Sequence, residues 1–136
     1  MFKGGHEAYA RGARLNLAMN RGLALKFKSI YPDMKKQYRA HSWEGEATLG
    51  DVFCYETSDD RPTVFNLLVQ RGPDRVLFSA FESAVERMYH LMIEKNFNDV
   101  GMSRIGVDRG TLTEEQFFEG LSRIRDSSRR HVTVYE

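Results

Sequence analysis

The clearest pattern along the chain is a helical repeat of apolar residues between residues 77 and 96. Apolar side chains recur there every three or four positions, which is the spacing of one face of an amphipathic α-helix. They are Phe78, Phe81, Val85, Met88 and Met92. We therefore expect a helix over 77–96, with its methionines packed in the core rather than serving a cofactor.

Two strand patterns precede this helix. Residues 52–56 (VFCYE) and 63–70 (TVFNLLVQ) are rich in β-branched and aromatic residues, and residues 58–62 between them have the composition of a turn. The second segment has little polar content. A strand of that kind is typical of a sheet covered by helices on both faces, so we expect it to be buried on both sides.

Further elements are expected on either side of these. Thr113 and Gln116 have the spacing of a capping box, which opens a helix. The other expected elements are an extended segment at 6–13, helical segments at 22–31 and 33–40, a strand at 100–105, a helix at 113–125 and a strand at 131–135. This order predicts one α/β domain over residues 1–136, with a mixed sheet between helix layers.

Charge and composition narrow the function classes. Twenty basic and nineteen acidic residues give a net charge of +1, so no overall field indicates a nucleic-acid or membrane partner. No apolar run approaches the roughly 20 residues of a membrane span, and no signal-peptide pattern opens the chain. These observations predict a globular protein with a cytoplasmic location.

Few residues outside the loops suggest chemistry. Basic groups at 26–36 and 123–130 fit solvated helix faces, with a phosphate-bearing ligand as the alternative. The one cysteine, Cys54, lies in an apolar run, so we expect a buried thiol rather than a nucleophile. The histidines show no partner or metal-ligand spacing, so we expect solvated or helix-face positions for them and neither a metal nor a cofactor. They are His6, His41, His90 and His131.

A ligand is expected where a strand delivers a loop into the N-terminus of a helix, because free backbone N–H groups and the helix dipole attract anions there. Two loops have that position, residues 16–23 (NLAMNRGL) and residues 106–112 (GVDRGTL). Gly22, Gly106 and Gly110 would let the backbone approach a phosphate, or would serve the turn alone. We expect valine at Gly22 or Gly106 to block a phosphate without disturbing the core. Neither loop matches a Walker or Rossmann motif.

Longer stretches resemble macro domains. Residues 12–38 (GARLNLAMNRGLALKFKSIYPDMKKQY) resemble the segment in which a strand ends and a glycine loop opens a helix, and residues 100–117 (VGMSRIGVDRGTLTEEQF) resemble the second glycine loop and its helix. Residues 49–56 (LGDVFCYE) and 63–71 (TVFNLLVQR) are similar to two central strands, and 131–136 (HVTVYE) to the last strand. The closest branch includes ADP-ribose-1''-phosphate phosphatases and terminal ADP-ribose hydrolases of glutamate-linked protein. The resemblance implies a three-layer α/β/α fold that binds ADP-ribose at the C-terminal ends of its strands.

The resemblance also implies site residues. Asn16 lies nearest to the family's ribose-contacting asparagine, although another register places Arg14 there. Asp108 and Asn16 are the candidate catalytic residues. The implied ligand-binding positions are Asn16, Met19, Asn20, Arg21, Gly22, Leu23, Gln70, Gly106, Val107, Asp108, Arg109, Gly110 and Leu112.

Both loops depart from the family's pattern. Where relatives carry two glycines, this chain has Asn20 and Arg21 in one loop and Asp108 and Arg109 in the other. An arginine of either loop would contact a pyrophosphate, and Asp108 would order a ribose hydroxyl or a water. A surface ion pair between Asp108 and Arg109 is the alternative.

Two departures bear on catalysis and on adenine. The lysine and aspartate that the glutamate-linked hydrolases use fall on Gln70 and Gly110, so a route through a covalent lysine is disfavoured and slow or no release of ADP-ribose is expected. The aspartate that meets adenine in the family has no counterpart, because only residues 1–5 precede the resemblance.

Three functions from different classes remain. In order, they are a module that binds ADP-ribose or a derivative, a hydrolase that removes ADP-ribose or its terminal phosphate, and a degenerate macro domain that acts in protein interaction. The expected partner is ADP-ribose or an ADP-ribosylated macromolecule, with nucleic acid involved only through ADP-ribosylation and no membrane. A shortened N-terminal unit would expose a sheet edge, which favours a homodimer.

Overall fold

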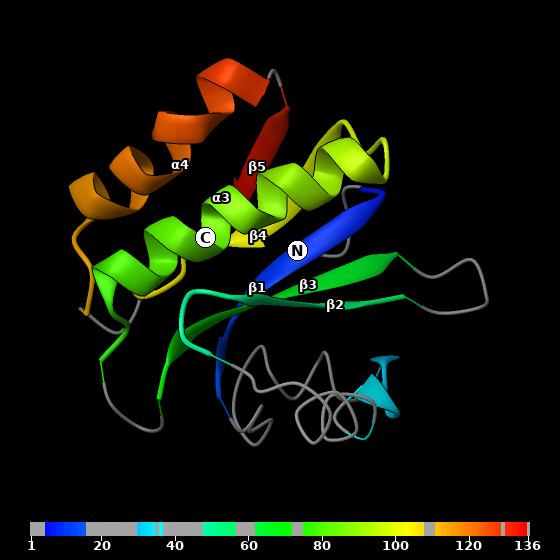
Figure 1. Cartoon of the computed structure of the whole chain (residues 1–136), viewed down its shortest axis with the longest axis horizontal. Coiled ribbons are helices and arrows are strands. Elements are labelled where there is room, and N and C mark those ends of the chain that lie inside the picture. The colour runs from blue at the N-terminus through cyan, green and yellow to red at the C-terminus, as the bar shows by residue number, and fades with distance from the viewer. Residues whose placement is uncertain are drawn as a thin grey trace.

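The computed structural model describes residues 5–15, 30–34, 36, 48–56, 62–71, 75–107, 111–128 and 130–135, with the backbone alone for 123–128. Five strands and two long helices are formed by these residues (Figure 1). They are β1 (Ala8–Arg14), β2 (Val52–Tyr55), β3 (Thr63–Gln70), α3 (Phe78–Glu94), β4 (Asp99–Ser103), α4 (Glu114–Ser128) and β5 (His131–Tyr135).

The strands form one mixed sheet, as the element order predicts. Their spatial order is β2-β3-β1-β4-β5. β1 runs parallel to both β3 and β4, and β5 runs parallel to β4, whereas β2 is antiparallel to β3. The carboxyl ends of β3, β1 and β4 therefore lie side by side at the same end of the sheet, which we call its carboxyl edge.

β3 is buried along seven of its eight residues, which confirms the prediction that both of its faces are covered. Phe65, Leu67 and Val69 belong to the larger core cluster, which includes α3, whereas Val64 and Leu68 belong to the smaller cluster on the opposite face. The alternation follows from the period of two along a strand.

The helix layers are clearest on one face. α3 and α4 lie together over one face of the sheet (Figure 1). The predicted apolar stripe of α3 is confirmed, with Phe81, Val85, Met88 and Met92 fully buried. On the opposite face, Tyr31 and Met34, which flank a turn at residues 32–33, pack in the smaller core cluster. None of the helices formed by the described residues is long and apolar enough to cross a membrane.

Two predicted helices lie mostly outside the described residues. Of the segments 22–31 and 33–40, only residues 30, 31, 33, 34 and 36 are described. The predicted strand at 100–105 was wrong at both ends, since β4 begins at Asp99 and ends at Ser103. The Ile105 N–H donates to the Ser103 carbonyl at 2.9 Å, which turns the chain out of the sheet.

One strand residue is unexpected in a sheet interior. Arg11 of β1 is only 4% exposed, and burial lowers the pKa of its guanidinium to about 10, so the side chain stays charged at neutral pH. Its register partner on β3 is Asn66, which is fully buried on the same face and donates to the Phe53 carbonyl at 3.1 Å. The smaller half of the core thus has a polar centre.

A glycine sets the spacing between the two long helices, and it yields a stability prediction. A Cβ at Gly120 of α4 would lie 2.7 Å from the ring of Phe81, which is fully buried on α3. Alanine normally stabilises a helix by about 1 kcal/mol over glycine, but overpacking costs about 1–3 kcal/mol. Since these terms partly cancel, we expect Gly120→Ala to lower the free energy of unfolding by up to about 2 kcal/mol in urea denaturation. The exposed neighbour Glu119→Ala should change it by less than about 0.5 kcal/mol, and equal effects of the two variants would contradict this packing.

Candidate functional site

The candidate site lies where β3, β1 and β4 end side by side. Arg14, the last residue of β1, pairs with Gln70, the last residue of β3, after a register shift that follows Ala13. The Leu15 N–H then donates to the Gln70 carbonyl at 3.0 Å, which ties the start of the next segment to β3. The structure thus places Gln70, a predicted ligand-binding residue, half-buried at this edge.

An arginine stands at the end of each of these three strands. Arg14 closes β1, Arg71 follows β3 directly and Arg104 follows β4 directly. Because the three strands are neighbours and parallel, these three residues lie at the same end of the sheet. We call Arg14, Arg71 and Arg104 the arginine rim. Sequence reasoning missed Arg71 and Arg104, because the sequence shows an arginine near the end of each strand but does not show that these strands are neighbours in the sheet.

A closed turn follows β4. Gly106 has a positive φ of 80°, and its carbonyl accepts hydrogen bonds from the N–H groups of Thr111 and Leu112 at 2.9 and 3.0 Å. The Thr111 hydroxyl donates to the same carbonyl at 3.0 Å. The two ends of the predicted second loop are therefore held together by one peptide group.

The expectation that valine at Gly106 would leave the core undisturbed was wrong. A Cβ there would lie 2.8 Å from Cγ of Leu112, which is 5% exposed and part of the larger core cluster. A substitution at Gly106 therefore changes the turn and the core as well as any space for a phosphate.

Val107 and Leu112 contribute packing rather than ligand-facing side chains. Leu112 is in the larger core cluster and Val107 packs against it. If either residue contacts a ligand, its backbone is the group available. The remaining predicted site residues lie outside the described part of the chain; they are Asn16, Met19, Asn20, Arg21, Gly22, Leu23, Asp108, Arg109 and Gly110.

The N-terminus of α4 is closed by its own side chains. The predicted capping box is confirmed, since the Gln116 N–H donates to the Thr113 hydroxyl at 3.1 Å and the Thr113 N–H donates to the Gln116 side chain at 3.0 Å. The first turn carries Glu114 and Glu115, and Arg104 contacts Glu114 at 3.0 Å. These carboxylates oppose an anion at this helix end, and the ion pair with Glu114 offsets the charge of Arg104. Positive charge for a ligand at this end of the sheet would therefore come from Arg14 and Arg71.

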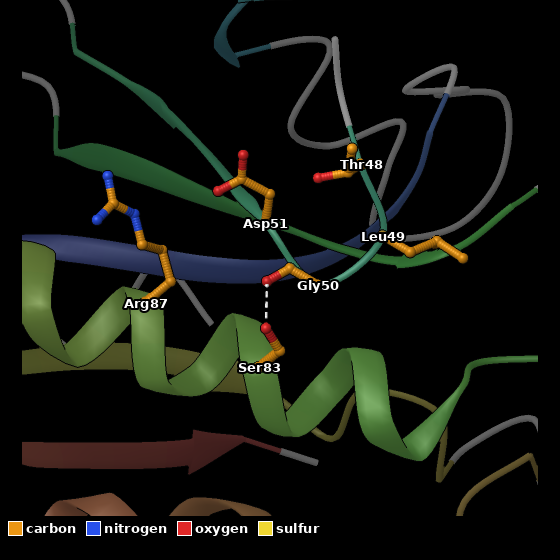
Figure 2. Close-up of a pocket in the computed structure, with 6 residues that line it drawn as sticks. All are labelled: Thr48, Leu49, Gly50, Asp51, Ser83 and Arg87. Atoms are coloured by element: carbon orange, nitrogen blue, oxygen red, sulfur yellow. Dashed lines mark hydrogen bonds between the residues drawn. The ribbon is translucent and has the colours of Figure 1, made fainter.

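A shallow hollow of about 260 Å³ lies elsewhere, between the start of β2 and α3. Figure 2 shows the Ser83 hydroxyl donating to the Gly50 carbonyl at its floor, with Asp51 and Arg87 on its sides. It is lined by none of the residues predicted to bind a ligand. We therefore do not assign the ligand to it.

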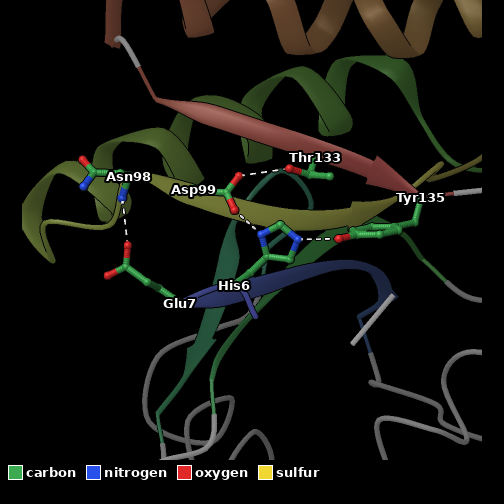
Figure 3. Close-up of polar contacts among 6 residues, drawn as sticks. All are labelled: His6, Glu7, Asn98, Asp99, Thr133 and Tyr135. Carbon is green, nitrogen blue, oxygen red and sulfur yellow. Dashed lines mark hydrogen bonds and ion pairs between the residues drawn. The ribbon is translucent and has the colours of Figure 1, made fainter. Parts of the chain in front are cut away.

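His6 departs from the prediction of a solvated histidine. Its side chain is 6% exposed; Nδ1 bonds Asp99 and Nε2 bonds the Tyr135 hydroxyl (Figure 3). The neutral tautomer with a proton on Nδ1 satisfies both contacts, donating to Asp99 and accepting from Tyr135. The Thr133 hydroxyl donates to the other oxygen of Asp99 at 3.1 Å. This network links the start of β1 to β4 and β5.

The other histidines differ from His6. His90 and His131 are exposed, as predicted, and His41 lies outside the described residues. Among the described residues, no group of three or more histidine, cysteine and acidic side chains has the arrangement of a metal site.

Cys54 is half-buried on β2, and its environment disfavours the thiolate. Burial raises the pKa of its thiol from 9.0 to about 11, with a nearby Lys95 opposing the shift. The side chain also packs against the larger core cluster. These features agree with the predicted inert thiol.

We expect iodoacetamide to alkylate Cys54 at pH 8 roughly 100-fold more slowly in the folded protein than in urea, since two pKa units reduce the thiolate about 100-fold. Because the pKa is raised on folding, this thiol leaves stability unchanged below pH 9 and lowers it as the pH rises from 9.0 towards 11. Equal alkylation rates in mass spectrometry would contradict this environment.

The fold defined by this sheet and its helices is the macrodomain fold. The macrodomain of Mycobacterium tuberculosis DarG superposes with a TM-score of 0.86 at 23% identity, covering 98% of this chain and 90% of that one. Thermosipho africanus DarTG, solved in complex with ADP-ribose, superposes with a TM-score of 0.86 at 15% identity, covering 99% of this chain and 39% of that one. The resemblance seen in the sequence is thus confirmed for the fold.

Sequence comparison finds a relative that matches over part of its length. A curated relative from Mycobacterium tuberculosis, named DNA ADP-ribosyl glycohydrolase, is 27% identical over 108 residues. The match takes in 76% of this chain but only 30% of that protein. No protein-family model matches the chain.

Proposed function

We propose that the chain binds ADP-ribose, free or attached to a macromolecule, at the shared carboxyl edge of β3, β1 and β4. The observation that carries the proposal is the arginine rim, which places three arginine residues at the ends of neighbouring parallel strands. Arg104 is paired with Glu114, so the charge for a ligand falls mainly to Arg14 and Arg71. Guanidinium groups bind phosphate oxygens through paired, charge-assisted hydrogen bonds. A pyrophosphate is the part of ADP-ribose that such an edge fits.

Two further observations support the same ligand. The turn at Gly106 lies at this end of the sheet and brings the backbone groups of Gly106 and Val107 to it. Thermosipho africanus DarTG, which shares the fold, was solved in complex with ADP-ribose. Ligands of open α/β sheets bind at the carboxyl ends of the strands, which is where the rim lies.

A hydrolase is the second candidate, favoured by the name of the curated relative, DNA ADP-ribosyl glycohydrolase. It makes ADP-ribosylated DNA a substrate to test beside ADP-ribosylated protein. Gln70 stands where the resemblance implies a lysine in the glutamate-linked hydrolases, and its amide has no acid–base chemistry. Binding is therefore our first proposal, and catalysis would fall to Asp108 or Asn16.

Calorimetry with ADP-ribose, ADP, AMP and NAD tests binding. We expect ADP-ribose to bind with a dissociation constant on the order of micromolar or weaker, and more tightly than AMP, which lacks the pyrophosphate. No heat at millimolar ADP-ribose would reject the binding proposal and favour a degenerate macrodomain.

Single-turnover release separates binding from hydrolysis. ADP-ribosylated DNA and glutamate-linked ADP-ribosylated protein would be incubated with excess parent chain and with Asp108→Ala. We expect slow or no release from the protein substrate. Rapid release that is lost in Asp108→Ala would replace the binding proposal with hydrolysis.

A further inference from the structure

β5 is an edge strand, and among the described residues it pairs only with β4 (Figure 1). The His131 N–H donates to the Asn98 carbonyl at 2.9 Å, so the backbone groups of His131 face β4. Backbone groups alternate in direction along a strand. The N–H and C=O groups of Val132 and Val134 therefore point outward, away from the sheet.

This edge lacks the features that usually prevent strands from pairing. Natural edge strands are blunted by charged residues, proline or a bulge, whereas β5 reads HVTVY and pairs in unbroken register with β4. Its valines lie half-buried against the larger core cluster on the helix side. The opposite face carries the exposed His131 and Thr133.

Side chains hold this edge strand in place. Figure 3 shows the Tyr135 ring turned inward to His6, and the Thr133 hydroxyl bonded to Asp99 of β4. Both contacts lie on the sheet face rather than on the outward side of β5. Because β5 is already ordered by these contacts, it loses little conformational entropy when it pairs with another strand.

We propose that β5 pairs antiparallel with β5 of a second copy of this chain, about a two-fold axis at Thr133. In that register Val132 of one copy lies opposite Val134 of the other, and their outward N–H and C=O groups form the hydrogen-bonded pairs of an antiparallel ladder. Thr133 faces Thr133 of the second copy as a non-hydrogen-bonded pair. The two sheets become one, and the interface is isologous.

The sequence of β5 argues for a second copy rather than another partner. In an antiparallel pair with its two-fold axis at Thr133, a residue that precedes Thr133 in one copy lies opposite the residue that follows Thr133 by the same number of positions in the other copy. The sequence HVTVY reads almost the same in both directions from Thr133. Valines then meet valines, threonine meets threonine, and His131 meets Tyr135, which are favourable cross-strand pairs.

The size of the interface sets its strength. Five residues from each copy bury far less than the roughly 1,600 Å² of a standard stable interface. We therefore expect a weak dimer with a dissociation constant on the order of 10⁻⁴ M, visible as a concentration-dependent mass in sedimentation equilibrium.

Cysteine cross-linking tests the register. In a Cys54→Ala background, which has no other cysteine, Thr133→Cys should form a disulfide dimer under mild oxidation, because its two copies face each other within bonding range. His131→Cys is the matched control, since its two copies lie four residues apart along the strands, about 13 Å. Equal cross-linking of both variants, or none by Thr133→Cys, would overturn the proposal.

A proline variant tests the edge without cysteine. The Val132 N–H points outward, so Val132→Pro leaves the bonds to β4 in place while removing a donor from the proposed ladder. We expect it to weaken dimerisation at least tenfold, roughly the value of the two hydrogen bonds lost, with an unchanged far-UV spectrum. A parent chain that stays monomeric at millimolar concentration, or a folded Val132→Pro that dimerises like the parent, would reject β5 as a self-pairing edge.

Discussion

Replacing Arg14 or Arg71 with alanine is expected to weaken ADP-ribose binding by roughly 10- to 100-fold each, because a charge-assisted hydrogen bond contributes about 1.5–3 kcal/mol. Arg14 is half-buried and Arg71 exposed, and neither belongs to the core clusters, so their removal should leave the fold intact. Arg14→Lys should give an intermediate affinity, since lysine keeps the charge but not the paired donors. Calorimetry with ADP-ribose measures all three.

Arg87→Ala provides the matched control. This arginine is equally exposed but lies on α3, beside the hollow of Figure 2, away from the arginine rim. It should bind ADP-ribose within about twofold of the parent. If Arg87→Ala loses affinity and the two rim variants do not, the ligand lies at the hollow and the proposed site is wrong.

Gly106→Ala is expected to lower both stability and ADP-ribose affinity. The residue has a positive φ of 80°, and a Cβ would lie 2.8 Å from Leu112 Cγ and 3.1 Å from Thr111 Oγ1. A left-handed conformation costs an alanine roughly 1–2 kcal/mol, and overpacking adds about 1–3 kcal/mol. We expect urea denaturation to show a loss of roughly 2–4 kcal/mol.

Gly5→Ala separates the cost of the left-handed backbone conformation from the cost of overpacking. Gly5 also has a positive φ, of 64°, but a Cβ there would meet nothing within 4 Å among the described residues. It should lose only the conformational part, about 1–2 kcal/mol, and keep the affinity of the parent. Equal losses in the two variants would show that the turn at Gly106 does not pack on Leu112 as described.

Local signals explain what the sequence predicted well. β3 and β5 have the predicted bounds, because each is a compact run of β-branched and aromatic residues. The capping box at Thr113 and Gln116 depends only on residues three apart, and it forms as predicted. The macrodomain resemblance rests on the order and spacing of such segments, which is why it held for the fold.

Contacts between distant residues explain what was missed. His6 lies 93 positions from Asp99 and 129 from Tyr135, so no local spacing could reveal their network. The arginine rim likewise exists only once β1 is known to lie between β3 and β4. The error at Gly106 has a local origin, because Leu112 is only six positions away and the closing of the turn brings its side chain against Gly106.

Chemical-shift mapping during an ADP-ribose titration tests the central claim most directly. The proposed site predicts that the amide signals of Leu15, Arg71, Gly106 and Val107 shift together and saturate, while those of Gly50 and Ser83 at the hollow do not. Saturating shifts confined to the hollow, or none anywhere at millimolar ADP-ribose, would contradict a ligand site at the carboxyl ends of β3, β1 and β4.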